Sequence, residues 1–131
     1  MKFLFDNGTP KPIARHLVGH EVTYARKIGW HAMGNGELIR RAEEAGFQVL
    51  LSTDKNIRYQ QSLTGRKIAL VVLANQQWPV VRRYLERITA AVNAATPGSF
   101  VEVDIPYRLI WQRPIRENLA ATGRVIHGNR R

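Results

Sequence analysis

Apolar residues along this chain fall into five short runs, separated by longer segments in which apolar positions recur at helical spacing. The runs cover residues 2–5, 20–25, 47–52, 67–73 and 100–103. The third and fourth are nearly continuous apolar stretches, as expected for parallel strands that are covered on both faces. We therefore predict five β-strands at these positions.

The segments between these runs predict helices. Pro10 and Pro12 suit the start of a first helix that ends near Gly19, and Asn35 is placed to cap a second helix over residues 36–46. Residues 77–95 form the strongest helical pattern, with one apolar face: Val80, Val81, Tyr84, Leu85, Ile88, Ala91 and Val92. Strands that alternate with helices predict an α/β fold: a doubly wound parallel sheet with right-handed crossovers and helices on both faces.

The length of 131 residues suits one compact domain. We assign this domain to residues 1–103, because no further strand or helix pattern can be recognised from Asp104 onward. Residues 104–131 carry six arginines against two acids, a net charge of +4. This basic C-terminal extension also holds several large apolar residues, so it either packs on the domain or docks onto a partner.

The whole chain carries a net charge of +10 at pH 7. This excess of positive charge favours polyanionic partners, because each phosphate contact releases condensed counterions. An acidic protein would be attracted to the same positive charge. The chain has no cysteine, which excludes disulfides, thiolate metal sites and thiol nucleophiles.

Neither a membrane span nor a secretory signal is expected. The longest apolar run, residues 68–74, is far shorter than the roughly 20 residues that a spanning helix needs. Met1 is followed almost at once by a strand-like run, without the parts of a signal peptide. We expect a cytoplasmic protein without a membrane partner.

Carboxylates follow two of the predicted strands and begin one predicted helix. Asp6 follows the first strand, Asp54 lies just beyond the third, and Glu37 begins the helix that follows the second strand. Because parallel sheets bind ligands outside the carboxyl ends of their strands, we expect these three carboxylates to converge. Their mutual repulsion favours a hard divalent cation, Mg²⁺ or Mn²⁺, which could polarise a phosphoryl oxygen and activate water.

Neutral and basic side chains lie close to these acids in the sequence. Four residues could add neutral ligands, hold waters or orient a carboxylate: Asn7, Thr53, Asn56 and Asn75. Three basic residues also lie near these acids: Arg40, Lys55 and Arg58. Simpler interpretations exist for each acid, since aspartate after a strand is often a turn former and glutamate at a helix start is favoured by the dipole.

The order of three segments resembles a known family. "KFLFDNGTPKPIARHL", "GHEVTYARKIGW" and "NGELIRRAEEAGFQVLLSTDKNI" are similar to PIN-like domains, relatives of the VapC-type ribonuclease toxins of bacterial toxin-antitoxin modules. The resemblance spans roughly residues 2–103. It implies a Mg²⁺- or Mn²⁺-dependent ribonuclease with Asp6, Glu37 and Asp54 as the catalytic, metal-binding acids. It further implies RNA and a cognate antitoxin as partners, with Arg40, Lys55 and Arg58 holding the RNA backbone. The extension could also pair two subunits in a homodimer.

Three asparagines depart from the family pattern. Asn7, Asn56 and Asn75 stand where PIN-like relatives often carry further acids. The departure leaves a second interpretation open, a non-catalytic PIN-like module that binds RNA or protein. A third class, the phosphate-accepting receiver domains, needs an adjacent acid pair after strand one and a lysine after strand five. This chain has Asn7 and Asp104 at those places.

Overall fold

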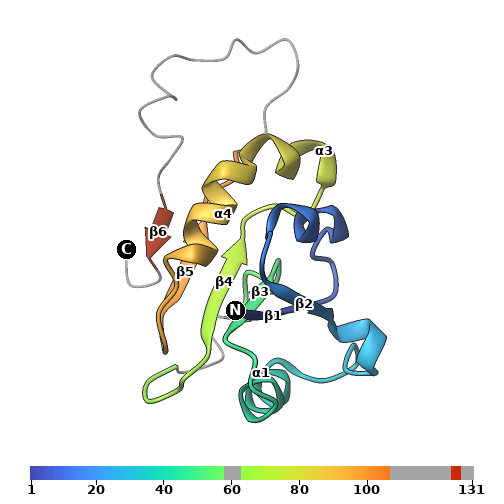
Figure 1. The fold of residues 1–131 in the computed structure, drawn as a ribbon, viewed down its shortest axis with the longest axis vertical. Coiled ribbons are helices and arrows are strands. Elements are labelled where there is room, and N and C mark those ends of the chain that lie inside the picture. The colour runs from blue at the N-terminus through green and yellow to red at the C-terminus, as the bar shows by residue number, and fades with distance from the viewer. Residues whose placement is uncertain (58–62, 107–124, 128–131) are drawn as a thin grey trace.

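The computed structural model describes residues 1–57, 63–106 and the strand at 125–127 (Figure 1). Arg58 and most of the predicted C-terminal extension lie outside the described residues. Five strands run parallel: β1 (Lys2–Phe5), β2 (Glu21–Tyr24), β3 (Val49–Ser52), β4 (Ala69–Leu73) and β5 (Phe100–Val103). The prediction of an α/β fold with a five-stranded parallel sheet is confirmed.

A sixth strand, β6 (Val125–His127), was not predicted from the sequence. It pairs antiparallel with β5, so that the full order is β2-β1-β3-β4-β5-β6. At three residues the strand is shorter than the window over which alternation can be recognised. The residue pattern of the extension therefore gave no strand signal.

Helices cover both faces of the sheet (Figure 1). One face packs against η1 (Lys11–His16), α3 (Trp78–Val81) and α4 (Leu85–Asn93), and the other against α1 (Asn35–Glu44). A further turn, η2 (Ala25–Ile28), follows β2 directly. The two cores contain the inward side chains of alternate strand residues, for example Phe3 and Phe5 on one side and Leu4 on the other.

Two predicted helices differ from expectation. The first is a 3₁₀ turn, η1, with prolines at Pro10 and Pro12, residues that supply no backbone N–H to extend an α-helical hydrogen-bond ladder. The long helix over 77–95 is interrupted by a 3₁₀ turn, η3 (Arg82–Tyr84), between α3 and α4. The chain bends there in Figure 1.

The direction of strand order reverses between β1 and β3. From β1 the chain first adds β2 on one side and later adds β3, β4 and β5 on the other. In doubly wound folds of this order, the crevice at the carboxyl ends of the two central strands is the usual ligand site. The carboxyl ends of β1 and β3 therefore form the expected ligand-binding edge of this sheet.

Within the part of the chain that the structure describes, no helix has the length and apolar character needed to cross a membrane.

Candidate functional site

Asp6 and Asp54 lie together at the switch point between β1 and β3. Asp6 continues the pairing of β1 with β3, since its backbone N–H donates to the Leu51 carbonyl at 2.9 Å. Asp54 lies two residues beyond the end of β3. The two carboxylates are close enough for the charge on Asp54 to raise the pKa of Asp6.

The Ser52 hydroxyl joins these two aspartates. It donates to Asp6 Oδ2 at 2.9 Å and accepts a hydrogen bond from the Asp54 backbone N–H at 3.0 Å. Ser52 is the last residue of β3 and is completely buried, so its hydroxyl holds one position. It thereby fixes the Asp6 side chain and the backbone of Asp54 relative to each other.

Asp54 is held by two further contacts. Its Oδ1 accepts the backbone N–H of Asn56 at 3.0 Å, which closes a local turn after the strand, and its Oδ2 accepts Asn35 Nδ2 at 3.1 Å. Asn35 is the first residue of α1, and Gly34 occupies the cap position without a side-chain cap. The prediction that Asn35 caps α1 is therefore wrong, because its amide contacts Asp54.

Burial is the main reason why the pKa of Asp6 lies above its ordinary value. The hydrogen bonds from Ser52 and the Asn7 backbone N–H act in the opposite direction, and the nearby Asp54 charge adds to the rise. Within residues 1–57 and 63–106, neither aspartate forms an ion pair with a basic side chain. The negative charge of this pair is thus left without a compensating side-chain cation in those residues.

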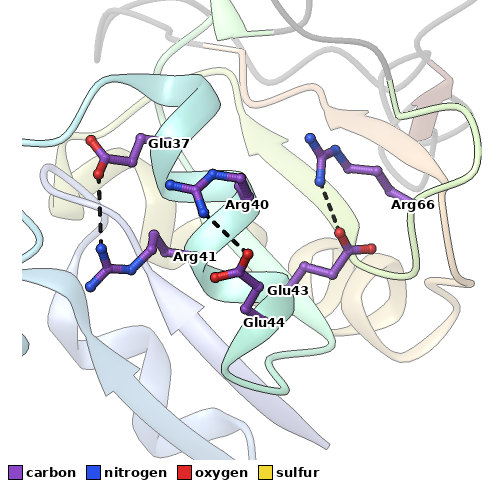
Figure 2. Close-up of polar contacts among 6 residues, drawn as sticks. All are labelled: Glu37, Arg40, Arg41, Glu43, Glu44 and Arg66. Carbon is purple, nitrogen blue, oxygen red and sulfur yellow. Dashed lines mark hydrogen bonds and ion pairs between the residues drawn. The ribbon is translucent and has the colours of Figure 1, made fainter.

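Glu37 does not join the two aspartates, so the expected convergence of three carboxylates is wrong. Its carboxylate lies 3.9 Å from Arg41 on the outer face of α1 (Figure 2). Positions 35 and 37 are about 200° apart around a helix of 3.6 residues per turn, so a helix that directs Asn35 to Asp54 turns Glu37 away. Among the described residues, no group of three or more acidic or histidine side chains could hold a metal ion.

The four supporting residues lie around the pair in different roles. Asn7 donates from Nδ2 to the His31 carbonyl at 3.0 Å, and Thr53 donates to Gln76 Oε1 at 3.3 Å. Asn56 closes the Asp54 turn through its backbone, and Asn75 Oδ1 accepts the Gln77 backbone N–H at 2.8 Å ahead of α3. These contacts order the rim of the sheet around the two aspartates.

A pocket of about 540 Å³ lies beside the pair at the ends of β3 and β4. Its lining residues are Thr53, Lys55, Ala74, Asn75, Gln76 and Gln77. Gly8 borders it at φ +85°, where an added Cβ would lie 2.9 Å from Thr53 Oγ1. Only glycine suits this backbone conformation and leaves the close approach intact.

The three predicted RNA-contacting residues are placed differently from one another. Lys55 is exposed at the pocket, next to Asp54. Arg40 forms an ion pair of 3.1 Å with Glu44 on the outer surface of α1 (Figure 2). Arg58 lies outside the described residues, so Lys55 is the one of the three whose described position adjoins the aspartates.

Searches for similar proteins do not identify the chain. No family profile matches it, and no match was found among curated proteins or solved structures.

The residues of this site fit a divalent cation. A hard ion such as Mg²⁺ or Mn²⁺ takes oxygen ligands, commonly one or two protein carboxylates, and keeps several of its waters. Asp6 and Asp54 supply two carboxylates at one rim; burial is the main cause of the raised pKa of Asp6, and the negative charge of Asp54, which such an ion would neutralise, adds to it. Two carboxylates suffice for one ion of this type but provide a smaller acidic set than the sequence predicted.

Replacing Ser52 tests how far this hydroxyl organises the pair. We expect Ser52→Ala to lower the free energy of unfolding by about 1–3 kcal/mol, because the partly buried Asp54 N–H and Asp6 carboxylate each lose a hydrogen-bond partner. The measurement is urea unfolding followed by circular dichroism. Ser99→Ala is the matched control, because this hydroxyl accepts a single bond from Thr96 in an exposed turn. Equal losses for the two variants would contradict the organising role of Ser52.

Proposed function

We propose that this protein is a metal-dependent endoribonuclease that hydrolyses RNA phosphodiesters at the β1/β3 switch point. The observation that carries the proposal is the pair of carboxylates, Asp6 and Asp54, fixed by one buried hydroxyl at the carboxyl edge of a parallel sheet. The net charge of +10 supports a polyanionic substrate. The resemblance to PIN-like domains points in the same direction.

Asp6 and Asp54 would hold the Mg²⁺ or Mn²⁺ ion. When bound, such an ion polarises a phosphoryl oxygen and activates a water for attack on phosphorus. Ser52 keeps Asp6 Oδ2 in position, and Asn35 does the same for Asp54 Oδ2. Lys55 lies beside the pair, where its ammonium group is placed to contact a phosphate of the substrate.

The toxin role and the cognate antitoxin follow from the resemblance alone. The same proposal predicts that expression in bacteria arrests growth. A homodimer is a further proposal of this kind, since the basic extension that would form it lies mostly outside the described residues.

A non-catalytic RNA-binding module is the second candidate, and the asparagines favour it. Asn7, Asn35, Asn56 and Asn75 lie around only two carboxylates, so the rim offers amides where further acids would strengthen metal binding. In this alternative the fold and the basic surface bind RNA without cleaving it.

A receiver-type function has one point in its favour, the strand order 2-1-3-4-5, which such domains share. Strand order alone does not determine function. The residue after β5 is Asp104, so the place of the receiver lysine carries the opposite charge, and Asn7 replaces the second acid after β1. These residues argue against phosphoryl acceptance.

RNA cleavage separates the first two candidates. We expect the wild type to cleave single-stranded RNA with Mn²⁺ or Mg²⁺ and not with EDTA, and Asp54→Asn to be slower by at least ~10²-fold. Glu37→Gln is the matched control, because Glu37 contacts Arg41 on the far side of α1 and should leave the rate within about twofold. RNA that is bound but not cleaved by the wild type would favour the non-catalytic module.

A further inference from the structure

A second pocket, of about 630 Å³, lies at the start of α4 and is lined by Arg82, Arg83, Tyr84, Leu85, Glu86, Arg87 and Ala90. We call it the Arg87 pocket. Three guanidinium groups and one carboxylate give this lining a net charge of +2. Arg82 and Arg83 are exposed, whereas Arg87 is only 6% exposed.

Arg87 is an unusual residue to bury in this way. Its Nη1 donates to the backbone carbonyl of Asp104, and its guanidinium lies 4.8 Å from the centre of the Tyr84 ring. Its Nε is buried and has no hydrogen-bond partner among the residues that the structure describes. A buried N–H without a partner costs free energy, so this donor favours an acceptor from outside the described residues.

The charge on Arg87 is also incompletely compensated. Burial lowers the pKa of Arg87, while the nearby Asp104 and Tyr84 act in the opposite direction. A guanidinium stays protonated in proteins, so this pocket holds a partly desolvated cation rather than a neutral group. Such a cation, with its planar array of donors, suits an oxyanion and in particular a phosphate.

The position of the Arg87 pocket relates it to the aspartate pair. α4 begins at the carboxyl edge of the sheet, because it follows β4 and its Arg87 contacts Asp104 directly after β5. β5 lies two strands from β3, a separation of roughly 10 Å. The pocket beside Lys55 lies between them, at the ends of β3 and β4. A few nucleotides of single-stranded RNA could therefore follow this edge from the aspartates to the Arg87 pocket.

We propose that the Arg87 pocket binds a backbone phosphate of RNA whose scissile bond lies at Asp6 and Asp54. The assignment rests on the proposed ribonuclease function. Arg87, which lines the pocket, supplies the buried Nε–H as a donor, and the exposed Arg82 and Arg83 supply further positive charge. The Asp104 carbonyl and the Tyr84 ring hold the Arg87 side chain in place.

RNA binding without divalent ions tests the proposal separately from cleavage. The probe is a fluorescein-labelled oligouridine of twelve nucleotides in EDTA, with the dissociation constant measured over a series of salt concentrations. We expect the double variant Arg82→Gln/Arg83→Gln to weaken binding about tenfold and to reduce the salt slope by about 0.7, because the pocket binds one phosphate and each phosphate contact to single strands contributes about 0.7.

The matched control is Arg15→Gln/Lys67→Gln, which removes the same charge. Both side chains are exposed; Lys67 precedes β4 at the opposite edge of the sheet, Arg15 lies on η1, and neither residue lines the Arg87 pocket. We expect this control to keep the wild-type salt slope. Equal slopes for both double variants would overturn the proposal. If the wild type fails to bind the RNA at all, the ribonuclease function fails with it.

A second measurement examines the Arg87 side chain in the wild-type protein. In ¹H–¹⁵N spectra of the wild type, we expect the Arg87 Nε–Hε resonance to shift saturably with inorganic phosphate and to shift with oligouridine. The resonance can be assigned through Arg87→Lys, which keeps the charge and removes the Nε donor. Absence of a shift with phosphate would overturn the proposal, as would a shift with a glutamate peptide but none with oligouridine.

Discussion

Asp6→Asn should slow RNA cleavage by at least ~10²-fold and, at the same time, raise the melting temperature of the metal-free protein at pH 8. The loss of rate is expected because the variant removes one of the two carboxylates that would hold the ion. The gain in stability is expected because partial burial makes the charged form of the Asp6 carboxylate unfavourable. A substitution that merely damaged the fold would change activity and stability in the same direction.

The sign of the stability effect follows from the raised pKa of Asp6. A carboxyl group whose pKa is higher in the folded chain than in the unfolded chain contributes stability while it is protonated. That contribution is complete below the ordinary value of 3.8 and is lost as the pH rises through the higher folded pKa. Asparagine has no such titration, so the difference between Asp6→Asn and wild type should be present at pH 8 and disappear below about pH 3.8.

Thermal unfolding of both proteins from pH 3 to pH 8 in EDTA measures this difference. Glu44→Gln is a suitable control, since its carboxylate is exposed and paired with Arg40 (Figure 2). Its melting temperature should follow that of the wild type closely. A melting temperature for Asp6→Asn below that of the wild type at pH 8 would contradict the account of Asp6 as a partly buried charge that has no ion-pair partner among the described residues.

The sheet could be predicted well because the apolar runs are short and sharply bounded. β1 and β5 were predicted with their observed bounds, since Asp6 ends the first run and Pro97 and Gly98 precede the last. The position of Asp6 and Asp54 at one edge then followed from the rule that parallel strands share their carboxyl ends.

The rotation of α1 about its own axis could not be predicted as well as the strands, and this explains the wrong prediction for Glu37. The sequence places an acid in the first turn of the helix, but a side chain reaches a strand end only if its angle around the helix is right. Leu38, Ile39 and Ala42 are the buried residues of α1, which fixes that angle and leaves Glu37 exposed. Asn35 precedes Leu38 by three residues and Ile39 by four, so it lies on the same side of the helix as this apolar face. That spacing was the available signal that Asn35, and not Glu37, faces Asp54.

Arg87 was missed for a related reason. The apolar residues from Val80 to Val92 keep helical spacing through η3, so the periodicity gives no sign of the 3₁₀ turn. Arg87 follows Tyr84 by three residues and precedes Ala91 by four, which places it on the apolar face. That spacing was the available signal that this arginine is buried.

The central claim is that Asp6 and Asp54 together hold a divalent ion, and a Mn²⁺ titration followed by thermal unfolding at pH 8 tests it most directly. At a hundredfold excess over the dissociation constant, binding adds about 2.7 kcal/mol of stability, a rise of several degrees for a domain of this size. We expect this rise for the wild type and for Glu37→Gln, and none for Asp6→Asn or Asp54→Asn. Equal rises in all four proteins, or no rise in the wild type, would contradict the claim.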